Sequence, residues 1–68
     1  QREWDGMEQA ILDAETAMEE ARLAAEDPAI ASDPAALQER YTALDTARAE
    51  VNRLYARWAE LEARQSGA

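Results

Sequence analysis

Apolar positions in the first half of the chain recur at alternating spacings of three and four residues. They are Trp4, Met7, Ile11, Ala14, Met18, Ala21 and Ala25. This 3-4 repeat is the heptad pattern of a coiled-coil helix, with successive members at positions a and d. Ala10, Ala17 and Ala24 add a row of small side chains at position g, which would let a partner helix approach closely. The pattern predicts a helix over about residues 2–26.

A second heptad repeat occupies the other half of the chain. Its a row is Leu37, Leu44, Val51 and Trp58, and its d row is Arg40, Ala47, Leu54 and Leu61. Tyr41 and Tyr55 lie one position further round and are expected to widen the apolar stripe. Arg40 is the defect of the seam, and it either lays its alkyl stem over a small alanine or faces a second molecule. The pattern predicts a helix over about residues 34–65.

Two Asp-Pro steps separate these repeats. They are Asp27-Pro28 and Asp33-Pro34, and they contain both prolines of the chain. Proline disfavours helical geometry in the residue before it and donates no backbone hydrogen bond, so the first helix must end near Asp27. Asp33 can cap the second helix, with Pro34 at the first helical position. We therefore expect residues 27–33 to connect the two helices of an all-α antiparallel coiled-coil hairpin, which forms a single domain over residues 1–68.

Folding at a hinge near Ala31 predicts which residues face each other. The expected pairs are Trp4 with Trp58, Met7 with Leu54, Ile11 with Val51, Ala14 with Ala47, Met18 with Leu44, Ala21 with Arg40 and Tyr41, and Ala25 with Leu37. Every pair except the one at Ala21 is apolar on both sides, which favours the hairpin. Because few of these side chains are large, we expect the isolated chain to be only marginally stable.

Composition excludes several classes of function. The chain has no cysteine and no histidine, which removes disulfides, thiolate zinc sites and the commonest general base. It has no glycine-rich phosphate-binding loop. The clustered glutamates Glu15, Glu19, Glu20 and Glu26 lack the buried cleft that a general acid needs. We expect no catalytic, cofactor or metal site, no small-molecule substrate, and no membrane contact, since no run of about 18 apolar residues occurs.

Charge is unevenly distributed along the chain, whose net charge is −8. Residues 1–34 contain ten acids and two arginines, whereas residues 35–68 contain five of each. Four arginines of the second helix are candidate nucleic-acid contacts, namely Arg48, Arg53, Arg57 and Arg64. The last three stand at i, i+4 and i+11 on one side of the helix, and Arg48 is expected nearby. Arginine rows can track a phosphate backbone. The alternative is a solvated face whose arginines pair with Glu50, Glu60 and Glu62.

Several short segments support a comparison with a known family. They are Glu3-Trp4, Met7-Glu8 with Ile11, the two Asp-Pro steps, Leu37, Leu44 and the run Tyr55-Ala56-Arg57-Trp58-Ala59-Glu60-Leu61-Glu62. Together they resemble the C-terminal coiled-coil domain of the bacterial ABC-F ATPases, Uup-type branch. The resemblance implies a cytoplasmic, ribosome-associated parent whose ATP and Mg sites lie in other domains, and a C-terminal domain associated with DNA binding. The Lys-rich linker that precedes such domains is missing here.

Two functions stay open from the sequence. The first is a non-catalytic accessory domain of an ABC-F ATPase that contributes to contact with DNA or ribosomal RNA. The second is a structural or protein-interaction coiled coil that docks to a partner or forms a homodimer. The chain begins without methionine and in the middle of a helical pattern. We therefore expect it to be a C-terminal fragment of the larger ATPase.

Overall fold

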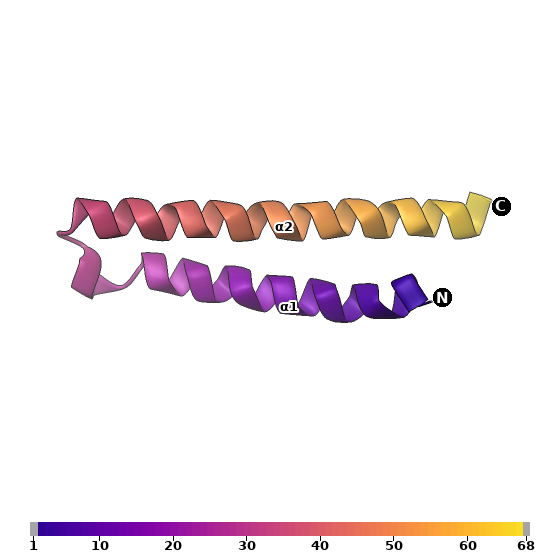
Figure 1. Ribbon diagram of the computed structural model, residues 1–68, viewed down its shortest axis with the longest axis horizontal. Coiled ribbons are helices and arrows are strands. Elements are labelled where there is room, and N and C mark those ends of the chain that lie inside the picture. The colour runs from indigo at the N-terminus through magenta and orange to yellow at the C-terminus, as the bar shows by residue number, and fades with distance from the viewer. Residues whose placement is uncertain (1, 68) are drawn as a thin grey trace.

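The chain forms two antiparallel helices joined by a short connector in a computed structural model (Figure 1). The structure describes the backbone of residues 2–67 and the side chains of residues 5–65. Helix α1 spans Arg2–Ala25, the 3-10 helix η1 spans Pro28–Ile30, and helix α2 spans Pro34–Gly67. The hairpin measures 54 × 15 × 12 Å, so it is a rod one helix pair thick. The predicted all-α hairpin is confirmed.

The first Asp-Pro step ends α1 and starts η1. Asp27 has φ −62° and ψ 120°, the extended geometry that a following proline favours. Its Oδ1 accepts a hydrogen bond from the Ala29 N–H at 2.9 Å. α1 therefore ends at Ala25, one residue before the predicted boundary, and the connector contains a turn of 3-10 helix that the sequence pattern did not indicate.

The second Asp-Pro step starts α2. Asp33 Oδ1 accepts a hydrogen bond from the Ala36 N–H at 3.2 Å, and the Asp33 carbonyl accepts one from the Leu37 N–H at 3.0 Å. Asp33 is therefore the N-cap residue that the sequence indicated, with Pro34 as the first helical residue. α2 continues to Gly67, beyond the predicted end near residue 65.

The heptad seam forms the core between the two helices. Its buried members are Met7, Ile11 and Ala25 of α1 and Leu44, Val51 and Leu54 of α2. All six occupy a or d positions. The e-position residues Tyr41 and Tyr55 behave differently, since they are 50% and 46% exposed. They border the apolar stripe without joining its buried core, because a two-helix seam leaves the e flank uncovered unless a third helix packs there.

The register of the two helices agrees with the predicted one where a pair can be followed in the core. Leu54 shares one buried cluster with Met7, its predicted partner, and with Ile11. Val51, the predicted partner of Ile11, is buried but lies outside that cluster. Arg40, expected opposite Ala21, reaches further along α1, where its Nη1 donates to the Ala24 carbonyl at 3.0 Å.

The connector continues to turn after the end of α1. Ala31 N–H bonds back to the Pro28 carbonyl and Asp33 N–H to the Ile30 carbonyl. Figure 1 shows the chain crossing to α2 after η1. The predicted pair of Trp4 with Trp58 lies outside the described side chains. Trp58 itself packs against the buried cluster that contains Leu54.

Arg40, the defect of the heptad seam, has a defined role in the hairpin. Its side chain is half-buried, and its hydrogen bond to the Ala24 carbonyl joins α2 to the last turn of α1. Carbonyl groups in the last turn of a helix lack helical N–H partners and carry partial negative charge. The guanidinium therefore stabilises the end of α1 and links the two helices.

Candidate functional site

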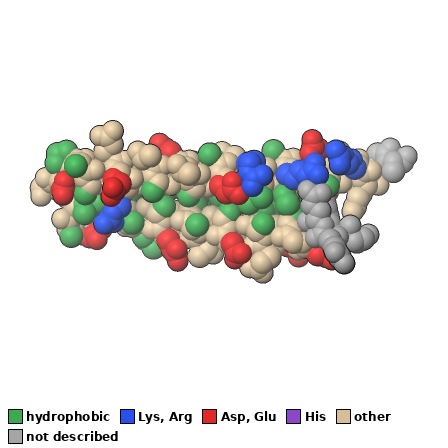
Figure 2. All heavy atoms as spheres, viewed as in Figure 1, with side chains coloured by type: hydrophobic (Ala, Val, Ile, Leu, Met, Phe, Trp, Pro, Cys, Tyr) green, Lys and Arg blue, Asp and Glu red, His purple; other side chains and the backbone are tan. Residues whose placement is uncertain are grey.

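Three of the four candidate arginines share one side of α2. Arg57 and Arg64 follow Arg53 by four and eleven residues, which at 3.6 residues per turn places all three within about 40° of each other. The Arg53 side chain is 65% exposed, Arg57 is half-buried and Arg64 is exposed. Figure 2 shows basic side chains gathered along the C-terminal half of α2. We call Arg53, Arg57 and Arg64 the arginine face.

Arg48 does not belong to the arginine face. It precedes Arg53 by five residues, and this spacing places the two side chains about 140° apart around a helix. It lies 3.8 Å from Asp45, measured between Nη1 and Oδ1. The expectation that Arg48 would lie near the other three is therefore wrong, because five residues are almost one and a half helical turns.

Two members of the arginine face pair with glutamates of their own helix. Arg53 donates to both carboxylate oxygens of Glu50, from Nη2 at 2.7 Å and from Nε at 2.9 Å, and Arg57 donates to Glu60. The hydrogen bonds from Arg53 hold the pKa of Glu50 below its ordinary value. Arg64 forms no ion pair among the residues whose side chains are described. Solvent-exposed pairs of this kind contribute little and exchange partners readily.

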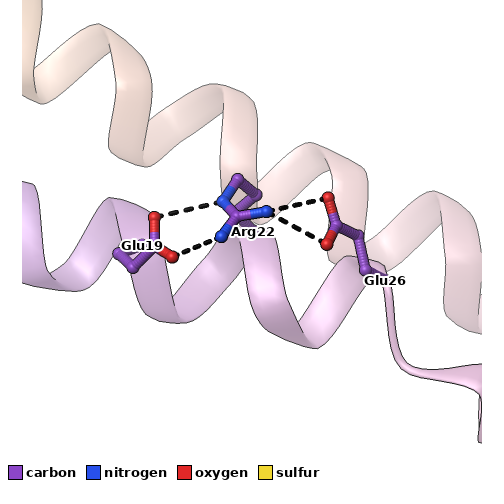
Figure 3. Close-up of polar contacts among 3 residues, drawn as sticks. All are labelled: Glu19, Arg22 and Glu26. Carbon is purple, nitrogen blue, oxygen red and sulfur yellow. Dashed lines mark hydrogen bonds and ion pairs between the residues drawn. The ribbon is translucent and has the colours of Figure 1, made fainter.

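α1 offers no comparable basic surface in its described part. Arg22 lies between Glu19 and Glu26, one turn away on either side (Figure 3). Its Nη1 donates to both oxygens of Glu26 at 3.0 Å, and its Nε donates to Glu19 at 3.1 Å. The hydrogen bonds to Glu19 and the neighbouring carboxylates raise the pKa of Arg22, and the same contact lowers the pKa of Glu19. Arg22 thus stabilises the C-terminal part of α1 and is surrounded by acids.

A shallow groove of about 520 Å3 runs between the helices on a different flank. Its lining residues are Glu8, Ile11, Leu12 and Glu15 of α1 and Tyr55 and Trp58 of α2, and we call it the Tyr55 groove. The Tyr55 hydroxyl donates to Glu15 Oε2 at 2.6 Å and so closes one side of it. Leu12 is 58% exposed although it is a large aliphatic residue. Sequence reasoning missed this groove, and the signal that could have found it is a leucine outside the heptad seam with a glutamate one turn away on each side.

The hydrogen bond to Glu15 raises the pKa of Tyr55, and partial burial and the glutamate charge act in the same direction. An ionised phenol could not donate this bond and would be repelled by the carboxylate, so the protonated form is favoured. We expect Glu15→Ala to lower the pKa of Tyr55. Absorbance at 295 nm during an alkaline titration measures this, in a Tyr41→Phe background that leaves Tyr55 as the one tyrosine. An unchanged titration curve would show that the Tyr55–Glu15 bond does not persist in solution.

Most of the hairpin matches a known family of domains. Residues 1–63 match the family described as the ABC transporter C-terminal domain. The chain belongs to this family. The match confirms the resemblance to the C-terminal coiled-coil domain of ABC-F ATPases and makes the hairpin an accessory domain of an ABC protein. No curated protein and no solved structure matches the chain.

Three kinds of site can be checked in this ABC transporter C-terminal domain: a nucleotide-binding fold, a metal site and a membrane span. Its described backbone consists of helices and a connector without strands, so this part contains no nucleotide-binding fold. Within residues 5–65, no group of three or more acidic side chains is arranged to hold a metal ion. Neither helix is long and apolar enough, over its described residues, to cross a membrane. The arginine face and the Tyr55 groove are therefore the surfaces from which a function can be argued.

Proposed function

We propose that this ABC transporter C-terminal domain is a non-catalytic accessory module that contributes to contact with nucleic acid, either DNA or ribosomal RNA, through the arginine face. The observation that carries the proposal is the placement of Arg53, Arg57 and Arg64 on one side of α2. As the family resemblance implies, the parent would be a cytoplasmic ABC-F ATPase that supplies ATP and Mg binding from other domains.

Local charge supports this surface over the rest of the molecule. The arginine face combines three arginines with two paired acids, Glu50 and Glu60, whereas the whole chain carries −8. A phosphate can replace an exposed carboxylate as the partner of a guanidinium, and arginine binds phosphate oxygens in pairs. Each phosphate that is neutralised releases counterions, which gives the affinity a steep dependence on salt. Because the net charge opposes binding, we expect the isolated chain to bind weakly and at low salt.

The test compares two arginines on different sides of α2. Arg53 and Arg48 are both exposed on α2, and each has an acidic partner three residues earlier. We expect Arg53→Glu to weaken binding to duplex DNA or to structured RNA and to reduce the salt slope by about one. Arg48→Glu changes the net charge equally and should weaken binding much less. Titrations of labelled duplex and hairpin RNA at several salt concentrations measure both effects.

The outcomes of this comparison are distinct. A larger loss in Arg53→Glu, which deepens in the double variant Arg53→Glu, Arg57→Glu, supports the arginine face as the contact. Equal losses in Arg53→Glu and Arg48→Glu would show that net charge alone governs binding. That result would contradict the proposal, as would a double variant with the affinity and salt slope of the parent.

A second function, docking to protein or self-association, is favoured by the Tyr55 groove. Exposed apolar side chains such as Leu12 and Tyr55 on a hairpin this small indicate a contact surface when they lie together beside a groove. Sedimentation of the chain over a range of concentrations separates the two forms of this function. A homodimer requires a mass that rises with concentration, whereas docking to another protein does not.

A further inference from the structure

The α1 side of the Tyr55 groove has a regular arrangement of charge. Glu8, Leu12 and Glu15 stand at i, i+4 and i+7, so they follow one line along the helix surface. Leu12 therefore lies between two carboxylates, each about one turn away. An apolar side chain between two acids at this spacing is the complement of a helix that carries an apolar residue with a basic residue one turn to either side.

The α2 side of the groove supplies aromatic surface. Tyr55 and Trp58 stand at i and i+3 and both line the groove, with Trp58 also packed against the buried cluster of the seam. The bond from Tyr55 to Glu15 ties the phenol to the α1 side of the groove, which Leu12 also lines. Aromatic rings in this setting offer both apolar contact and a face that attracts cations.

We propose that the Tyr55 groove binds a basic amphipathic helix of a partner protein, which packs against the hairpin as a third helix. An apolar side chain of the partner would contact Leu12 and Tyr55. Lysine or arginine residues one turn before and after it would pair with Glu8 and Glu15. This inference develops the docking function named above and uses none of the residues of the arginine face.

Charge complementarity favours this occupant over a second copy that docks through its own α1. Residues 1–34 carry ten acids and two arginines, and α1 forms one wall of the groove. A second copy that placed its own α1 on the groove would bring like charges together, which opposes association. A basic helix instead gains from the same field, because the acidic surface steers it towards the groove and aligns it there.

The test uses a synthetic peptide of about 18 residues with leucine at positions a and d, lysine at e and g, and alanine elsewhere. Fluorescence anisotropy of the labelled peptide gives its affinity for the 68-residue chain. We expect Leu12→Ala to weaken binding at least fivefold. Leu23→Ala is the matched control, because Leu23 is 54% exposed on the same helix but lies about 16 Å further along its axis. Leu23→Ala should leave the affinity within twofold.

A charge reversal separates docking from general attraction. The double variant Glu8→Lys, Glu15→Lys should bind the lysine peptide with an affinity at least tenfold lower than that of the parent. It should gain affinity for a peptide with glutamate in place of lysine. Glu20→Lys, Glu39→Lys makes the same change of net charge at exposed residues outside the groove and should show a much smaller loss. Equal losses in the two double variants, or in Leu12→Ala and Leu23→Ala, would overturn the proposal.

Variants of the arginine face test the docking proposal independently of the nucleic-acid proposal. Arg53→Glu, Arg57→Glu should bind the lysine peptide at least as well as the parent chain does, because the groove is intact and the net charge is more negative. If this variant lost the peptide, the arginine face would belong to the docking surface and the groove as defined here would be wrong. Circular dichroism of each variant confirms that its helix content matches that of the parent.

Discussion

Leu54→Ala is expected to lower the free energy of unfolding by about 2–3 kcal/mol, enough to leave much of the chain unfolded at 25 °C. Leu54 is 6% exposed and shares one buried cluster with Met7 and Ile11, so it packs against the N-terminal half of α1. Truncation removes apolar area from a core that has few large side chains to lose. The expected cost lies at the low end for leucine because two helices can close partly around the gap.

Leu12→Ala is the matched comparison for Leu54→Ala. The two substitutions remove the same atoms, but Leu12 is 58% exposed, so its loss should change stability by less than about 0.5 kcal/mol. Urea unfolding followed by circular dichroism at 222 nm measures both variants. Similar losses for Leu12 and Leu54 would mean that the seam between α1 and α2 is not the core of the folded chain.

Arg40→Ala is expected to cost about 1–2 kcal/mol, and Arg40→Glu more. The guanidinium donates to the Ala24 carbonyl at 3.0 Å, and a hydrogen bond from a charged group at a helix C-terminus is among the stronger kinds. Glutamate would place a negative charge where the end of α1 already carries partial negative charge. Arg40→Met keeps a long apolar stem and should recover the part of the loss that comes from packing.

Arg48→Ala is the control for Arg40, since Arg48 lies on the same helix with an exposed side chain. It should leave stability within about 0.5 kcal/mol of the parent. Urea midpoints of Arg40→Ala and Arg48→Ala, measured in the same buffer, make the comparison. If Arg40→Ala unfolded at the same urea concentration as the parent, the bond to Ala24 would contribute nothing to the stability of the hairpin.

Much of the fold could be predicted because heptads and Asp-Pro steps act locally. The alternation of apolar residues fixes which side of each helix is buried, and Asp33 caps α2 through atoms three residues away. Two other features could not be predicted in the same way. The 3-10 turn η1 depends on hydrogen bonds within the connector, and the bond from Arg40 to Ala24 joins residues that are distant in the sequence.

The two candidate surfaces also differ in how far the sequence predicts them. The alignment of Arg53, Arg57 and Arg64 follows from helix geometry, and so does the separation of Arg48, which sequence reasoning overlooked. The Tyr55 groove depends on what the second helix covers. Tyr55 was expected to widen the apolar stripe, but the sequence does not show that two helices leave that flank open and 46% of the side chain exposed.

The Tyr55 groove, which is lined by both helices, requires that α1 and α2 fold back on each other within one chain. Spin labels at Gln9→Cys and Ala59→Cys, two exposed positions, test this by double electron–electron resonance. A hairpin with axes about 8–10 Å apart predicts a label separation of about 20–30 Å, which persists when labelled chains are diluted with excess unlabelled chain. One continuous helix would give about 75 Å, and a swapped dimer would lose the short distance on dilution. Either of these results would contradict the account.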